Sequence, residues 1–363
     1  MMLVENQVET GQEQHASLLE VKRGGTITVL VPAYNEARTI ADTIQSLQQQ
    51  TIPIDEIVVI DDVSTDGTGE VARSYGVTVV HPPKNTGSKA GAQNYALQNV
   101  ETEFTMAIDA DTTLAPDAIE RLLTAFEDPD VAAACGFVIP RYVRTVWERG
   151  RYIEYLFAFS FFKQIQDFFG KPLISSGCFS VYRTEMLKEN RGWSTRTLAE
   201  DMDLTWSFYQ KGYHVRFIPE AVCYPIEPHN FLFMSRQLKR WSHGFVQNVR
   251  LHWHAVRRID YLNYMIAVLL WDGVIATFAY LILLPLFTLI FKNPFFLIGY
   301  VIDVPAIVIP TLWMAFKRKE VGRLLTSIPA FFVLRTVNAV FMLEAIWSEI
   351  VMKRTFHVYE KGH

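Results

Sequence analysis

Charged residues almost disappear from the last third of this chain, and this change limits what the chain can fold into. From residue 1 to about 258, acidic and basic residues are interspersed throughout. Between Leu262 and Val351 they become scarce, and apolar runs approach the length of a membrane span. A transmembrane helix needs about 20 mainly apolar residues. We therefore expect a water-exposed domain joined to a membrane-embedded tail.

The tail contains three apolar segments. Val274–Phe291 carries no charge, and Pro294–Phe316 contains only one aspartate, whereas Leu324–Val351 contains an arginine and two glutamates. Basic residues before the first segment and after the second predict an outward and returning pair of spans. The third segment has basic residues on both flanks, which does not fit a simple span under the same rule. Either the chain ends outside the membrane against that rule, or this segment re-enters the membrane or lies on its surface. Its charges indicate that part of it faces protein or a water-filled path.

Composition excludes several classes of protein. The chain has 363 residues, enough for about two domains. Its formal net charge is −4, and no lysine- or arginine-dominated domain is present to bind nucleic acid. Its three cysteines cannot form a disulfide framework, which favours reduced thiols in a cytosolic compartment. No GxxxxGK[ST] sequence supports P-loop chemistry.

The start of the chain is polar and lacks the apolar core of a signal peptide. We expect it to be flexible, with the following domain on the cytoplasmic side of the plasma or inner membrane. The expected division is a flexible lead (1–25), a catalytic domain (26–230), an interfacial helix region (231–258), a transmembrane region of two to three helices (259–352) and a C-terminal tail (353–363).

Strand-like and helix-like segments alternate between Thr26 and about Ile218. This alternation predicts an α/β fold with a mostly parallel sheet and helices on both faces. Ligands of such sheets bind beyond the carboxyl ends of the strands. Strands are expected at Ile27–Val31, Ile57–Asp61, Val77–His81, Phe104–Asp109 and Val131–Val138, and helices at Thr39–Gln49, Ser88–Asn99 and Pro116–Phe126.

Acidic residues follow three of these strands. The first strand leads into Glu36, the second ends at Asp61, and the fourth ends at Asp109-x-Asp111. Aspartate and asparagine are also favoured in turns after strands. Their gathering at one edge of the sheet favours a ligand site, and the paired carboxylates suit Mg²⁺ or Mn²⁺ bridging to a diphosphate.

Two further groups of residues each allow two interpretations. Glu200-Asp201 opens a predicted helix, where acids compensate the helix dipole or where Asp201 serves as a general base. Arg240-Trp241 either anchors an interfacial helix, or contacts a diphosphate and stacks on a sugar. The aromatic-rich segment Trp147–Phe169 is either an interfacial helix or an ordinary core helix.

Taken in order, these residues resemble the family 2 inverting glycosyltransferases. The matching motifs cover roughly Thr26 to Gly244, and the last of them resembles the QxxRW of membrane-integrated processive synthases of cellulose, chitin, hyaluronan and poly-N-acetylglucosamine. The motifs are VPAYNE (31–36), DDVSTDGT (61–68), SKAGAQN (88–94), DADT (109–112), SSGCFSVYR (175–183), AED (199–201) and QLKRW (237–241).

The resemblance implies a GT-A-type, Rossmann-like fold and a role for each matching position. Asp201 would be the catalytic base. A divalent metal, Mg²⁺ or Mn²⁺, would bind at Asp109 and Asp111. The donor would be bound by Pro32, Tyr34, Glu36, Asp61, Lys89, Asp109, Arg240 and Trp241, and the acceptor by Ser176, Gly177, Cys178 and Glu200.

The expected function is that of a membrane-embedded inverting glycosyltransferase. It would use a UDP-sugar, UDP-N-acetylglucosamine or another UDP-hexose, to extend a β-linked polysaccharide. The alternative is a single transfer to a polyprenyl phosphate or glycolipid. Expected partners are the donor, a polysaccharide or lipid-linked acceptor and the bilayer, with a second copy or a partner subunit completing a polymer path. A non-catalytic scaffold would have lost some of the motif residues, and none is missing.

Overall fold

One eight-stranded sheet forms the centre of the computed structural model, which describes residues 25–259 and 261–356. The strand order is β3-β2-β1-β4-β7-β6-β8-β5. The β3-β2-β1-β4 half is parallel, whereas β7 runs antiparallel to both β4 and β6. The strands are β1 (Ile27–Ala33), β2 (Glu56–Asp61), β3 (Thr78–Val80), β4 (Phe104–Ile108), β5 (Thr112–Leu114), β6 (Val131–Val138), β7 (Phe179–Arg183) and β8 (His214–Pro225).

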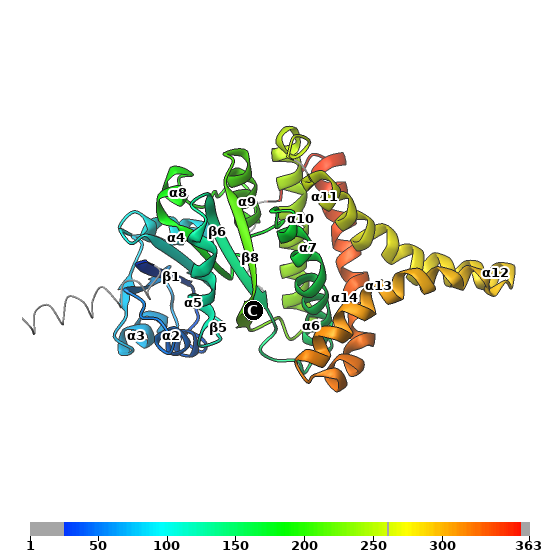
Figure 1. The fold of residues 1–363 in the computed structure, drawn as a ribbon, viewed down its shortest axis with the longest axis horizontal. Helices are drawn as coiled ribbons and strands as arrows, with labels where there is room; N and C mark the ends of the chain where they lie inside the picture. The colour runs from blue at the N-terminus through cyan, green and yellow to red at the C-terminus, as the bar shows by residue number, and fades with distance from the viewer. Residues whose placement is uncertain (1–24, 260, 357–363) are drawn as a thin grey trace, which may run out of the picture.

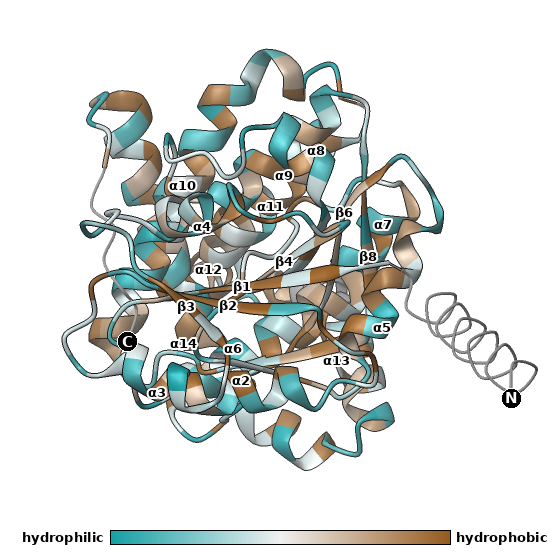
Figure 2. Cartoon of the chain, turned by 90° about the vertical axis from the view of Figure 1, so that its left-hand side faces the viewer, coloured by the Kyte–Doolittle hydropathy of each residue, from teal (hydrophilic) through white to brown (hydrophobic). Residues whose placement is uncertain are grey.

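The expected α/β fold is confirmed, with a mixed half that the sequence did not predict. All five predicted strands are present, with ends within two residues of those expected. The short β5, together with β7 and β8, was not predicted. The β1 sequence ITVLVPA is buried at all but one residue, as is typical of a parallel strand covered on both faces. Figure 2 shows this apolar strand lying between layers of helix.

Helices cover both faces of the sheet. Of the two larger hydrophobic cores, one joins the sheet to α2, α5 and α6, and the other joins it to α4, α9 and α10. The Ser88 hydroxyl caps α4 by accepting from the Gly91 amide at 3.1 Å. The helices of this part are α2 (Ile40–Gln48), α3 (Thr68–Ser74), α4 (Lys89–Leu97), α5 (Ala118–Leu123), α6 (Val146–Phe157), α7 (Lys163–Phe168), α8 (Thr184–Glu189), α9 (Glu200–Gln210) and α10 (Phe231–Val256).

The aromatic-rich segment forms α6, a π-helical turn and α7. On α6 the side chains of Arg151 and Tyr152 are completely buried, whereas Phe168 at the end of α7 is 85% exposed. Most of this segment is therefore a wall of the folded domain, and its far end presents an aromatic surface.

The C-terminal part contains two stretches long and apolar enough to cross a membrane, Leu262–Phe291 and Val321–Val351. They include the first and third segments expected from the sequence. The second expected segment was Pro294–Phe316. The apolar helix that the described residues form there, Ile307–Lys317, is shorter than a membrane span. The elements are α11 (Leu262–Leu270), η3 (Trp271–Ala276), η4 (Ala279–Leu283), α12 (Leu284–Phe291), η5 (Pro294–Gly299), α13 (Tyr300–Lys317), α14 (Val321–Ile346) and η6 (Trp347–Val351).

These two stretches are placed very differently. In Figure 1, α11 to α12 and the returning α13 form a hairpin that projects from the molecule, with α12 at its tip. Helix α14 instead packs on α6 and α10 across the base of this hairpin. The approach of α6 and α14 requires a glycine, since a Cβ on Gly150 would lie 2.8 Å from the Cβ of Leu334.

Three charged side chains of α14 and η6 make contacts with protein, as expected from the sequence. Arg335 donates to the Asp272 carboxylate at 2.8 Å and to its backbone carbonyl at 2.9 Å, in the π-helical turn η3. Glu344 and Glu349 both contact the ring of the buried His243 on α10, each at 3.0 Å. The lead (1–24) and the end of the tail (357–363) lie outside the described residues.

Candidate active site

A cavity of about 770 Å³ opens at the carboxyl ends of β1 and β4 and extends between α6, α10, α11 and α14. Its walls include every sequence-predicted site residue except Asp61. Those brought together are Pro32, Tyr34, Glu36, Lys89, Asp109, Asp111, Ser176, Gly177, Cys178, Glu200, Asp201, Arg240 and Trp241.

At the end of β2, the neighbouring aspartates have different surroundings. The parallel register places Asp61 beside Ala33 of β1, but its carboxylate is buried and accepts from the Ser64 amide at 3.0 Å. The next residue, Asp62, lines the cavity instead. Its two oxygens accept from the amide and hydroxyl of Thr86 at 2.8 and 2.9 Å. The second aspartate therefore fixes a loop of the cavity wall.

Lys89 joins two walls of the cavity. As the first residue of α4, it makes an ion pair with Asp109 at the end of β4, and it donates to the Gly177 carbonyl at 2.8 Å. The Asp109 amide in turn donates to the Cys178 carbonyl at 3.4 Å. The loop before β7 is thus held against the DxD turn, with a lysine ammonium between them.

The two carboxylates of the DxD turn suit a divalent metal that is completed by its ligand. Both Asp109 and Asp111 line the cavity, and carboxylate oxygens are preferred ligands of Mg²⁺ and Mn²⁺. Within the described residues, no three His, Cys, Asp or Glu side chains form a metal-binding group. Diphosphate oxygens of a bound donor would therefore have to supply further ligands.

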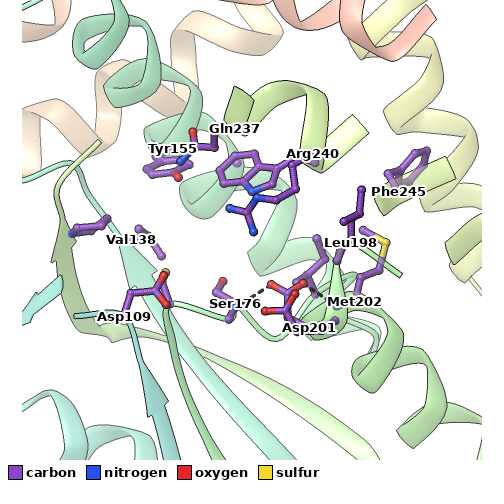
Figure 3. A pocket seen from close by; sticks show the side chains of 18 of the residues that line it. Asp109, Val138, Tyr155, Ser176, Leu198, Asp201, Met202, Gln237, Arg240 and Phe245 are labelled. Carbon is purple, nitrogen blue, oxygen red and sulfur yellow. Dashed lines mark hydrogen bonds between the residues drawn. The ribbon is translucent and has the colours of Figure 1, made fainter. Parts of the chain in front are cut away.

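Asp201 lies at the start of α9, where its carboxylate is held by two backbone amides. One oxygen accepts from Gly177 at 2.9 Å and the other from Met202 at 2.8 Å. A Cβ on Gly177 would lie only 3.0 Å from that first oxygen, so this close approach favours glycine. These contacts fix the direction in which the carboxylate faces the cavity, as Figure 3 shows.

The preceding residue, Glu200, also lines the cavity, and its carboxyl is buried. Burial raises the pKa of the Glu200 carboxyl, and the nearby Asp201 carboxylate raises this pKa further. Lys89 and Arg240 act in the opposite direction. Glu200 is therefore more readily protonated than an ordinary glutamate.

The QLKRW residues belong to α10, on the wall facing these acids. Figure 3 shows Arg240 pointing from that wall toward Asp201, with Asp109 on the same side of the cavity as Asp201. Trp241 lies over the guanidinium of Arg151, which is 4.5 Å from the ring centroid. Gln237 accepts from that same guanidinium at 2.7 Å.

Several lining residues were not predicted from the sequence. Glu154 and Tyr155 on α6, Glu227 after β8 and Asn338 on α14 all face the cavity. Glu227 lies between two prolines directly after a strand. An acidic residue at a strand end is the pattern by which Glu227 could have been predicted from the sequence. No comparable pattern marks the other three.

The sheet, the acids at its carboxyl edge and the facing arginine define a glycosyltransferase of the GT-A type. Residues 28–191 match the family model described as glycosyl transferase family 2, and this part of the chain is a domain of that family.

The chain is also similar to curated and solved proteins. It is 28% identical over 223 residues to poly-β-1,6-N-acetyl-D-glucosamine synthases of Staphylococcus epidermidis and Staphylococcus aureus strain N315, a match covering 60% of this chain. The chain spans about half, 54%, of the length of these relatives.

Among solved structures, the mannosyltransferase PcManGT from Pyrobaculum calidifontis, in complex with GDP-Man and Mn²⁺, has a similar fold. The TM-score is 0.54 at 22% identity, and the match covers 88% of this chain and 87% of that one. At this coverage the shared fold extends beyond the family 2 domain.

Proposed function

We propose that this chain is a membrane-embedded inverting glycosyltransferase that extends a β-linked polysaccharide from a UDP-sugar donor. Its similarity to poly-β-1,6-N-acetyl-D-glucosamine synthases makes UDP-N-acetylglucosamine the first donor to test. The observation that carries the proposal is the single cavity in which Asp201 and Asp109 face Arg240.

The donor occupies the end of the cavity nearest β1 and β4. The nucleoside is surrounded by Pro32, Tyr34, Glu36 and Asp62, which line this end of the cavity, with Asp61 beside them at the end of β2. Lys89 and Arg240 contact the diphosphate, whose negative charge grows as the bond to the sugar breaks. Asp109 and Asp111 would hold Mg²⁺ or Mn²⁺, which supplies positive charge beside the leaving group.

The acceptor approaches from the opposite side, next to Asp201. The Asp201 carboxylate removes the proton of the acceptor hydroxyl. The hydroxyl oxygen then attacks the sugar C1 in line with the departing UDP. One base is sufficient because a diphosphate leaves without being protonated. Ser176, Gly177 and Cys178 border this position, and Gly177 orients the base through its amide. Inversion at C1 gives the β-linkage.

A single transfer to a polyprenyl phosphate or a glycolipid is the second candidate. The observation that favours it is the apolar far end of the cavity. There, Val268 and Leu269 of α11 and Phe331 and Met342 of α14 form the walls. A lipid chain entering from a membrane would find apolar contacts at this end.

One assay tests the donor and separates the two candidates. The full chain in lipid nanodiscs is given each UDP-sugar with Mn²⁺ or Mg²⁺, and UDP release, product mass and linkage are measured. We expect a ladder of product lengths, abolished by EDTA. One discrete lipid adduct would establish the second candidate instead. Failure to release UDP from every UDP-sugar, with every acceptor tried, would overturn the proposal.

A further inference from the structure

The short loop before α9 determines where the Asp201 carboxylate lies. Residues 197–199 run directly into this helix, and Ala199, the residue before its first turn, has no side-chain oxygen with which to cap it. The start of a helix needs partners from other elements when its own cap residue supplies none. Whatever holds this loop therefore also fixes the position of the base, which follows two residues after Ala199.

Helix α10 holds the loop with two buried amide side chains. The Gln247 side-chain oxygen accepts from the Leu198 amide at 3.0 Å, and the Asn248 side chain donates to the Ala199 carbonyl at 3.0 Å. The two elements also touch directly, since a Cβ on Gly244 would lie 2.7 Å from the Ala199 Cβ. Residues three and four apart lie on the same side of a helix, so one face of α10 fixes the position of the loop.

Gln247 also binds the C-terminal part of the chain. Its side-chain nitrogen donates to a Glu349 oxygen at 2.7 Å and to the Phe356 carbonyl at 2.9 Å. These partners allow one orientation of the amide group, because the Leu198 N–H can only donate, whereas the carboxylate and carbonyl oxygens accept. The oxygen and the nitrogen of the side chain are thus both engaged. The position of Gln247 therefore depends on its C-terminal partners as well as on the loop.

Glu349 fastens the C-terminal segment to α10. Its carboxylate is completely buried, contacts the His243 ring at 3.0 Å and accepts from the Phe356 amide at 3.0 Å. The Arg250 guanidinium lies 3.5 Å from the other carboxylate oxygen and donates to the Glu349 backbone carbonyl at 3.0 Å. A buried carboxylate is costly unless it is paired and hydrogen-bonded, so this set of contacts keeps the segment in one place.

A continuous series of hydrogen bonds thus runs from η6 through α10 to the loop before α9. It joins Glu349 to Gln247 and Gln247 to Leu198, which lies three residues before Asp201. Neither Gln247 nor Glu349 lines the cavity, whereas Leu198 and Asp201 do. The two buried side chains therefore act on the reaction only through residues that reach the cavity.

We propose that Gln247 is a positioning residue for the Asp201 base, and that Glu349 and the segment ending at Phe356 hold Gln247 in place. The C-terminal segment, distant from the base in sequence, is then required for an efficient transfer step. This inference rests on the proposed function, since it concerns the base of the same site.

Gln247→Ala tests the link to the base. The full chain in nanodiscs is given radiolabelled UDP-N-acetylglucosamine, Mn²⁺ and a trimer of N-acetylglucosamine. We expect kcat to fall about 10- to 100-fold, the effect of a small displacement of a reacting group, while the donor KM stays within about twofold of the parent value.

The same substitution in an Asp201→Asn background separates positioning from a structural role. It should lower the residual kcat by less than about twofold, because no base is left to position. An equal loss in both backgrounds, or a parent-like kcat in folded Gln247→Ala, would overturn the inference. Absence of UDP release from the parent chain with every UDP-sugar would instead count against the proposed function itself.

Two variants of Glu349 test the C-terminal segment. Glu349→Ala removes the partner of Gln247 and should reproduce the fall in kcat. Glu349→Gln keeps an oxygen for the Gln247 amide and should recover about half of the parent kcat or more. A parent-like kcat in folded Glu349→Ala, or a Glu349→Gln protein as slow as Glu349→Ala, would remove the segment from the catalytic arrangement. This pair also decides the question if Gln247→Ala does not fold.

Gln98→Ala is the matched control for Gln247→Ala. Gln98 is exposed at the end of α4 and does not line the cavity. The control removes the same side chain from a site that contacts neither the loop before α9 nor η6, and its kinetics should match those of the parent chain.

Discussion

At the scale of single residues, the geometry of Asp201 bears on whether this acid serves the reaction or only the start of its helix. Its oxygens accept from the amides of Gly177 and Met202, and its carboxylate faces the shared cavity. An acid that served only the helix dipole would not need the tight approach of Gly177. The placement therefore favours a role in the reaction.

Asp201→Asn tests this role. We expect the rate of transfer to fall about 10²- to 10⁴-fold, the usual effect of removing a general base, while donor affinity changes little. The asparagine oxygen can still accept from the Gly177 amide, so the fold should be kept, which a melting curve checks. Transfer and UDP release persisting at the parent rate would remove Asp201 from the reaction.

A second carboxylate of α9 has a structural role that depends on pH. Burial acts to raise the pKa of Asp203, but hydrogen bonds from Arg196 and His252, each 2.7 Å long, outweigh burial and lower this pKa to about 2. Because the folded pKa lies below the ordinary value of 3.8, the ionised form favours the folded state. This contribution, ~2 kcal/mol, is present above about pH 4 and is lost as the pH falls toward 2.

The expected result is a thermal midpoint that drops between pH 4 and pH 2 in the parent chain. Asp203→Asn should lower the midpoint at neutral pH and flatten its dependence on pH over that interval. Differential scanning fluorimetry across the range measures both. Parallel curves for the parent and the variant would show that Asp203 has no part in the acid transition.

The sequence located most of the candidate site because turn residues after parallel strands meet at one edge. It predicted Asp61 as a donor-binding residue, whereas the structure has the next residue, Asp62, lining the cavity. Successive side chains of a strand point to opposite faces, so only one of two neighbouring acids can face the cavity. Which one does so depends on how β2 ends, and this is set by contacts with the Thr86 loop. Arg151 was equally out of reach, since its partners come from distant parts of the chain.

At the scale of elements, α14 could not be assigned from the sequence because its apolar residues serve two purposes. Some face outward, whereas others, including Leu334 and Phe331, pack on the catalytic domain. Hydropathy alone does not distinguish a lipid-facing helix from a core helix of the same length. The pairing of Arg335 with Asp272 resolves the difference here, because it ties α14 to the base of the hairpin.

The α6–α14 contact predicts the effect of a small substitution. Gly150→Ala adds a Cβ that would meet the Leu334 Cβ at 2.8 Å and the Ala330 carbonyl at 2.9 Å, so one helix must move. We expect a loss of about 1–3 kcal/mol in stability and reduced transfer, because α14 forms a wall of the cavity. Thermal melting and a transfer assay measure the two effects.

Gly322→Ala is the matched control on α14. A Cβ added there meets nothing within 4 Å, and alanine favours a helix over glycine. Its stability should be equal to or slightly above that of the parent. If Gly150→Ala behaves in the same way, the close helix contact does not exist in the protein.

At the scale of the whole molecule, the hairpin and α14 imply a particular arrangement in a bilayer. Leu262–Phe291 contains 30 residues, which at 1.5 Å per residue gives about 45 Å, longer than the hydrocarbon core of about 30 Å. Helix α14 crosses the base of this hairpin beside α6 and α10 (Figure 1). If the hairpin crosses the membrane, α14 lies along the membrane surface and does not form a third span. The basic residues on both sides of the third apolar segment, Leu324–Val351, left several placements open. This arrangement corresponds to the one in which that segment lies on the membrane surface.

Cysteine labelling with a membrane-impermeant maleimide tests this arrangement on the full chain in sealed vesicles. Ser74→Cys marks the domain that contains the sheet, Asn293→Cys the hairpin tip and Met352→Cys the end of η6, which continues α14. The parent chain, with its cysteines buried or half-buried, sets the background. We expect Met352→Cys to label from the same side as Ser74→Cys and Asn293→Cys to label from the opposite side. Labelling of Met352→Cys together with Asn293→Cys would make α14 a span, because its two ends would then lie on different sides. Labelling of all three from one side would mean that the hairpin does not cross, leaving the whole C-terminal part on one leaflet.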